Sequence, residues 1–149
     1  MKNTDTAEEK GYDAGKKVSG IKRHSAVDTQ GLPHAIAVTT ANVTDRAGAL
    51  AAFSLNKKKA LSEMKNVLAD SAYIGEPFAA GVHDMLSATV EIAKRNELHT
   101  FIVMPKRCIV ERSFARLEKC RRLWKNCERK LNTNLQFVVL PFLVLVLRR

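Results

Sequence analysis

Cysteine is scarce in this chain of 149 residues, which holds Cys108, Cys120 and Cys127 and no Cys-x-x-Cys pair. An odd number of thiols with no signal peptide ahead of them does not make a disulfide framework, so we expect a reducing, cytoplasmic setting. The four histidines, at positions 24, 34, 83 and 99, lack the spacing of a zinc site. The sequence therefore disfavours disulfide-stapled folds and zinc proteins.

Long hydrophobic runs are missing as well. The membrane candidate is LQFVVLPFLVLVL, residues 135 to 147, which Gln136 and Pro141 interrupt. Because a spanning helix needs about 20 apolar residues, we expect a buried terminal helix there and no membrane span. The final Arg148 and Arg149 suit either the C-terminus of that helix or a lipid surface.

Positive charge is abundant. Lysine and arginine number 25 against 15 acidic residues, which gives a net charge of +10. Such an excess favours nucleic acid or an anionic membrane surface as the partner, although a basic surface without a partner stays open. With 46% hydrophobic residues, the chain can build the core of one domain.

The first half of the chain alternates between strand and helix patterns. Residues 1–20 are polar and read as a loose N-terminal segment, ahead of a single domain over residues 21–149. The turn-forming DTQG predicts a β-hairpin, residues 21–28 and 34–40. A helix is expected to begin at Thr44 or Asp45 and to run through ALAAFSL.

The same alternation continues to residue 104. KNVLAD predicts a strand that ends at Asp70, and PFAAGVHDML predicts a helix. SATVEIAKR and TFIVMP predict one or two more strands between residues 87 and 104. Strands and helices in this order indicate an α/β or α+β fold with a mixed sheet.

Residues 104–130, MPKRCIVERSFARLEKCRRLWKNCERK, hold ten basic residues against three glutamates. Apolar residues recur there at spacings of three and four, which predicts one long helix with a single apolar stripe. The stripe comprises Val110, Phe114, Leu117, Cys120, Trp124, Cys127 and Leu131.

Two carboxylates could share a metal ion. Asp70 stands at the end of a predicted strand, and Glu111 lies about 100° around the helix from Val110, on the flank of the stripe. Magnesium takes carboxylate, water and phosphate oxygens, and two such ions roughly 4 Å apart can drive phosphodiester chemistry. The alternative is that Asp70 is a turn residue and Glu111 pairs with Arg107, four residues away.

Three segments carry a resemblance to a known family. KRHSAVDTQGLPHAIAVTTANVTDRAGA, LADSAYIG and MPKRCIVERSFARLEKCRRLWKNCER resemble, in this order, segments of bacterial insertion-sequence transposases of the DDE (Asp-Asp-Glu) type. The resemblance implies an RNase H-like fold, a mixed sheet flanked by helices, in which two aspartates and a glutamate bind Mg²⁺. It makes Asp70 the second aspartate and Glu111 the glutamate.

The resemblance also implies contacts with DNA. Arg107 and Lys119 match basic positions of the family that are thought to contact DNA. We expect the neighbouring cations to hold the DNA backbone with them, and these are Arg112, Arg121, Arg122 and Lys125. Asp28 and Asp45 fall in family-like segments too, but we interpret them as a hairpin-turn residue and a helix cap.

The chain departs from the family pattern in two ways. Cys108 and Arg116 stand where tryptophan is usual, which affects the local packing. The first catalytic aspartate belongs to a stretch like DSQSVKNT, whereas this chain opens MKNT, so that aspartate would lie upstream of Met1. Asp5 and Asp13 follow the motif and do not replace it. We therefore expect a catalytic domain truncated at its N-terminus.

Three functional readings follow. The first is the C-terminal part of a DDE transposase, which binds DNA and, when complete, cuts and joins phosphodiester bonds with Mg²⁺ or Mn²⁺; alone it should be inactive. The second is a non-catalytic DNA-binding remnant, or an inhibitor of the full-length transposase that acts through mixed oligomers. The third is a surface-bound membrane protein.

Overall fold

Two small sheets organise the chain in a computed structural model, which describes residues 8–56, 61, 63–93 and 107–147. Strands β1 (Gly11–Asp13), β2 (Val18–Val27) and β3 (Pro33–Thr40) form an antiparallel sheet in that order. Strands β4 (Asn66–Ala69) and β5 (Thr89–Ile92) form a parallel pair. The mixed α/β class is confirmed, with the described strands divided between two sheets. The expected strand at TFIVMP lies outside the described residues.

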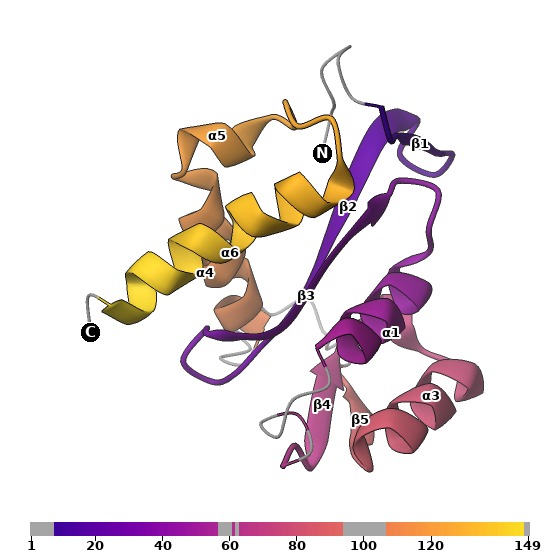
Figure 1. The fold of residues 1–149 in the computed structure, drawn as a ribbon. Helices are drawn as coiled ribbons and strands as arrows, with labels where there is room; N and C mark the ends of the chain where they lie inside the picture. The colour runs from indigo at the N-terminus through magenta and orange to yellow at the C-terminus, as the bar shows by residue number, and fades with distance from the viewer. Residues whose placement is uncertain (1–7, 57–60, 62, 94–106, 148–149) are drawn as a thin grey trace, which may run out of the picture.

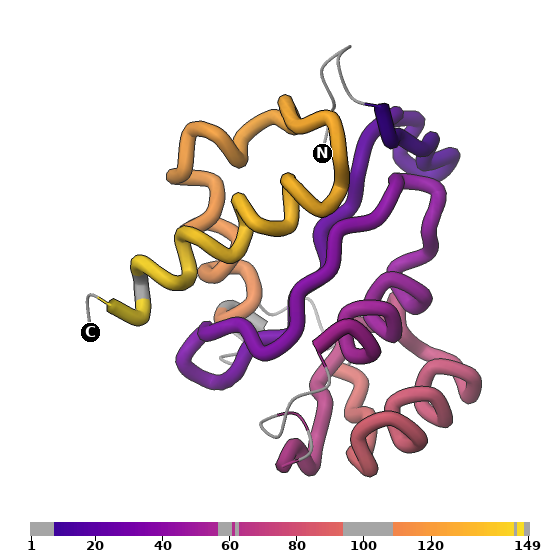
Figure 2. Tube along the Cα trace, viewed as in Figure 1, coloured from indigo at the N-terminus to yellow at the C-terminus, as the bar shows by residue number. Residues whose placement is uncertain are grey.

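The predicted β-hairpin is confirmed. β2 and β3 pair from Ile21 opposite Thr40 to Val27 opposite Pro33, with an irregularity after Ala26. In the turn, Gly31 has a φ of +81°, a conformation that glycine adopts without steric cost. The hairpin runs between two groups of helices (Figures 1 and 2).

The expectation of a loose segment through residue 20 is wrong for its second half. β1 pairs with the beginning of β2, at Gly11 opposite Gly20. The intervening turn is closed by Asp13, whose carboxylate accepts a hydrogen bond from the Lys16 N–H at 3.1 Å. Close packing explains why residue 11 is a glycine, because a Cβ on Gly11 would lie 2.1 Å from the Asn42 side chain.

Helices α1 (Asp45–Leu55) and α3 (Glu76–Leu86) cover one side of the strands, and both confirm predictions. Thr44 caps α1 by accepting a hydrogen bond from the Ala47 N–H. Phe53 from α1 and Phe78 and Val82 from α3 pack on small residues of β3. This first core joins both sheets, because Val67 of β4 and Val90 of β5 pack against it.

The predicted single basic helix is wrong. Between residues 107 and 130 the structure has two helices instead, α4 (Arg107–Glu118) and α5 (Arg121–Trp124), and the terminal helix α6 (Leu131–Leu147) follows them. Cys120 is extended, with φ −83° and ψ 104°, and Lys125 is extended again after α5. The apolar stripe is consequently split: Leu117 is buried in a second core with Leu123 of α5 and Phe142 of α6, neither of which belongs to the stripe, whereas Trp124 is 80% exposed.

The terminal helix α6 is buried on one side alone. Val138 and Phe142 enter the second core and Asn134 is buried beside them. The expectation of a buried helix is therefore wrong for the opposite side, where six apolar side chains are exposed: Val139, Leu140, Leu143, Val144, Val146 and Leu147. Among the described helices, none has the length and hydropathy to cross a membrane.

Candidate functional site

Asp70 directly follows β4 and begins a short 3-10 turn, η1 (Ser71–Tyr73). Its Oδ1 accepts a hydrogen bond from the Ala72 N–H at 2.9 Å, and its backbone carbonyl accepts one from Tyr73. The side chain is exposed. One carboxylate oxygen of Asp70 therefore caps the turn.

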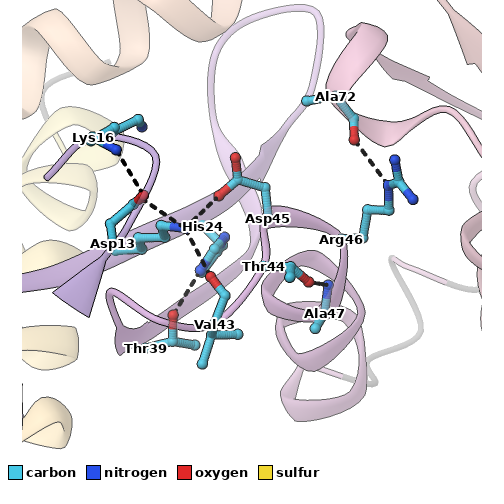
Figure 3. Close-up of polar contacts among 11 residues, drawn as sticks. Asp13, Lys16, His24, Thr39, Val43, Thr44, Asp45, Arg46, Ala47 and Ala72 are labelled. Carbon is cyan, nitrogen blue, oxygen red and sulfur yellow. Dashed lines mark hydrogen bonds and ion pairs between the residues drawn. The ribbon is translucent and has the colours of Figure 1, made fainter. Parts of the chain in front are cut away.

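Helix α1 holds this turn in place. The Arg46 guanidinium donates from Nε to the Ala72 carbonyl at 3.0 Å (Figure 3). Behind the turn, the Tyr73 ring lies 5.1 Å from the Phe78 ring. Burial, with smaller contributions from the charges of Asp45 and Asp70, raises the pKa of Tyr73 to about 12. The backbone that carries Asp70 is thus fixed by contacts from α1 and α3.

Asp45 and Asp13 converge on one cation. The Lys22 ammonium lies 3.1 Å from Asp13 Oδ2 and 3.4 Å from Asp45 Oδ1, and it donates to the Val43 carbonyl at 2.9 Å (Figure 3). Thr44 caps α1, and Asp45 follows it in the first turn. Of the two N-cap candidates Thr44 is confirmed, and the interpretation of Asp45 as the cap is wrong, because Asp45 is the first residue of the helix.

Asp28 is the hairpin-turn residue that its sequence context predicts. Its Oδ1 accepts the N–H groups of Gln30 and Leu32 at 2.8 and 2.9 Å, and its Oδ2 lies 3.2 Å from His34 Nε2. Burial raises the pKa of Asp28, but these hydrogen bonds outweigh burial and leave the pKa below 3.8. The carboxylate is committed to the turn.

Glu111 lies in the second turn of α4 with its side chain exposed. The helix is anchored by Ser113, which is 1% exposed and whose hydroxyl is 3.1 Å from the Gly31 carbonyl and 3.0 Å from that of Ile109. Val110 is also partly exposed. The buried face of α4 is thus centred on Ser113 and Leu117, and Glu111 points away from the second core.

Sharing of an ion by Asp70 and Glu111 stays a prediction. Across the residues that the structure describes, no three His, Cys, Asp or Glu side chains converge on a metal position. The two carboxylates come from the end of a strand and from a helix packed on β2. Their ligand type suits a hard divalent cation, because Mg²⁺ takes oxygen donors.

The basic residues predicted to contact DNA lie on α4, α5 and the segments beside them. Arg112, Lys119, Arg121 and Lys125 are exposed. Arg122 has structural contacts, because its Nε is 3.0 Å from Glu128 Oε1 and its guanidinium lies 4.5 Å from the centre of the Phe137 ring. The side chain of Arg107 lies outside the described residues.

Comparison with known proteins places this arrangement in a family. The family model described as "Transposase DDE domain" matches residues 1–147. The chain belongs to the transposase DDE domain family. No curated protein and no solved structure matches it.

The DDE domain assignment agrees with the mixed α/β fold and supports a role in transposition. Sequence reasoning did not find one feature of this DDE domain, a cavity beside α5 that contains Arg23. Arg23 belongs to a predicted strand, and the alternation of polar and apolar residues in that strand indicates only on which face of the sheet its side chain lies. Its proximity to α5, about 100 positions later, has no signal in the local sequence.

Proposed function

We propose that this DDE domain binds DNA and contributes Asp70 and Glu111 to the Mg²⁺ site at which phosphodiester bonds are cut and joined. The family match carries the proposal, because it covers both carboxylates. Mn²⁺ is the expected substitute, since it also prefers oxygen ligands. When bound, such ions activate the attacking oxygen and stabilise the leaving oxygen.

The chain's own residues would hold and orient that site. Asp70 is presented by a strand end and a turn that Arg46 braces from α1. Glu111 is presented by α4, which Ser113 fixes to the β2–β3 turn. Both anchors restrict the backbone, and a catalytic metal site depends on such fixed geometry.

The exposed cations would hold the DNA backbone. Lys119 and Arg121 flank the break between α4 and α5, so the break presents both to solvent. Phosphate contacts of this kind position a strand without reading its sequence. We therefore expect binding with little sequence preference, weakened steeply by salt.

DNA retardation against salt concentration tests the binding. Replacing Lys119 and Arg121 by alanine should remove two phosphate contacts and make the slope of log K against log salt shallower by about 1.8. Replacing the exposed Lys10 and Lys65 instead serves as the matched control, with no change of slope expected. Affinity that is independent of salt would refute the electrostatic interpretation.

The alternative function is a DNA-binding remnant, or an inhibitor of a full-length transposase through mixed oligomers. It is supported by the exposed Lys119 and Arg121, because binding of DNA through its phosphates requires no metal site. Cleavage of DNA at the ends of the element distinguishes the two. A chain extended at its N-terminus by the family's aspartate-bearing segment should cleave with Mg²⁺, and Glu111→Gln should abolish cleavage. An extended chain without cleavage supports the remnant.

A further inference from the structure

A cavity of about 800 Å³ opens where β2 meets α4 and α5. It lies apart from the turn that carries Asp70, since no residue of β4 or η1 lines it. Besides two leucines, the cavity is lined by Lys16, Arg23, Phe114, Glu118, Trp124 and Lys125. Three cations thus face one carboxylate, and two aromatic rings stand beside them.

Arg23 gives the cavity a cation that the protein leaves incompletely satisfied. Its Nη1 donates to the Leu123 carbonyl at 3.0 Å and its Nε to Asn134 Oδ1 at 3.3 Å. Its Nη2 is buried and has no hydrogen-bond partner among the described residues. Burial lowers the pKa of Arg23 to about 10. A partly buried guanidinium whose hydrogen bonds go to neutral oxygens favours an anion nearby.

Trp124 gives the same cavity an aromatic surface that the fold does not use. Its side chain is 80% exposed, whereas the preceding Leu123 is buried in the second core. The hydrogen bond from Arg23 to the Leu123 carbonyl fixes the end of α5, so it also fixes where Trp124 and Lys125 leave that helix. An exposed indole held beside cations is suited to stacking on a planar, anionic ligand.

We propose that this cavity binds an unpaired nucleotide of a DNA strand, its phosphate facing Arg23, Lys16 and Lys125 and its base stacked on Trp124. The inference rests on the proposed DNA-binding function and adds a subsite to it. Single-strand sites combine cationic grooves with aromatic rings in this way. In duplex DNA the faces of the bases are already stacked, so an indole finds no free face there.

Trp124 is the one tryptophan of the chain, so its fluorescence reports on the cavity alone. The full chain is titrated with a fluorescently labelled oligothymidylate, with a duplex of equal length, and with an abasic strand that keeps the phosphates. Anisotropy of the label gives the occupancy in each titration. At equal occupancy, the oligothymidylate should quench the tryptophan emission, and the duplex and abasic strands should leave it unchanged.

Two substitutions test the contact with the base and the contact with the phosphate separately. Trp124→Ala should weaken binding of the oligothymidylate roughly 5- to 150-fold. Lys125→Ala should lower the salt slope by about 0.7. Tyr12, 58% exposed on β1 and outside the cavity, provides the matched aromatic control in Tyr12→Ala. Since all three side chains are exposed, each variant should keep the melting temperature of the parent chain.

Failure of the subsite and failure of DNA binding give different results. Salt-dependent DNA binding with unchanged tryptophan emission, and equal affinities for Trp124→Ala and Tyr12→Ala, would overturn the cavity inference alone. Equal quenching by duplex and single strand would overturn the unpaired-base assignment. No binding of any DNA at low salt would overturn the proposed function and the subsite together.

Discussion

Gly48 should not tolerate a methyl group, although it lies inside a helix where alanine is intrinsically better. A Cβ on Gly48 would lie 2.2 Å from both Cε1 and Nε2 of the His24 ring. That ring is 6% exposed, and its Nε2 is 2.9 Å from Thr39 Oγ1. The ring must therefore shift from its buried position, and its hydrogen bond to Thr39 Oγ1 breaks.

The clash and the lost hydrogen bond destabilise the folded chain, whereas the higher helix propensity of alanine stabilises it. Overpacking costs roughly 1–3 kcal/mol, and losing a buried hydrogen bond costs roughly 1–2 kcal/mol. The gain in helix propensity from glycine to alanine is about 1 kcal/mol. We therefore expect Gly48→Ala to lower the free energy of unfolding by about 2 kcal/mol, and the melting temperature by roughly 4–8 °C.

Thermal and urea unfolding followed by circular dichroism measure this loss, and two variants make the test specific. Gly81→Ala on α3 is the matched control, because its Cβ would meet only the flexible end of Leu50, at 3.1 Å; its effect should stay within about 1 kcal/mol. In a His24→Ala background the clash is absent, so Gly48→Ala should stabilise the chain. A neutral or stabilising Gly48→Ala in the wild-type chain would refute the reasoning.

Three further predictions concern stability. Burial lowers the pKa of His24 below 6.5, so the stability that its neutral ring contributes is complete above pH 6.5 and falls as the pH drops below that value. His24→Gln should therefore make the free energy of urea unfolding less dependent on pH below 6.5. Asp28→Ala should cost roughly 2 kcal/mol in urea unfolding at pH 7; because the pKa of Asp28 is lowered in the folded chain, this cost should shrink as the pH falls from the ordinary value of 3.8 through the lower pKa of the folded state. Ser113→Ala should cost about 1 kcal/mol, and hydrogen exchange should show faster opening at the Gly31 turn; unchanged exchange there would contradict the anchoring of α4.

Local sequence signals predicted the first half of the fold well. DTQG gives the β2–β3 turn because Asp28 and Gly31 supply the side-chain acceptor and the positive φ that the turn needs. Thr44 similarly marks the start of α1 through its hydrogen bond to Ala47. These elements depend on contacts within a few residues, so their signals are contained in short segments.

The second half depends on contacts between distant residues. The Arg23 guanidinium donates a hydrogen bond to the Leu123 backbone carbonyl at 3.0 Å. The Asn134 side chain donates one from Nδ2 to Asn126 Oδ1 at 2.8 Å. These bonds compete with continuation of the helix, and the apolar spacing across Cys120 gives no sign of them. The outward side of α6 was missed for a related reason: an apolar helix does not reveal how much of its circumference the rest of the chain covers.

The candidate site was predicted only as a pair of positions. The family resemblance identifies Asp70 and Glu111, and the structure explains how a turn and a helix present them. Asp28 pairs with His34 inside the hairpin and Asp45 pairs with Lys22 of β2, so both have structural partners; that neither binds the metal ion stays a prediction. The cavity at Arg23 needed the tertiary structure.

The most direct test of the central claim is a double-mutant cycle on divalent-metal binding. Mn²⁺ binding is measured by water-proton relaxation for the parent chain, Asp70→Asn, Glu111→Gln and the double variant, with Asp84→Asn as an exposed control on α3. If both carboxylates hold one ion, each single substitution should remove most of the binding and the second should add little. Unchanged binding in both single variants, or losses that simply add, would contradict a shared metal site.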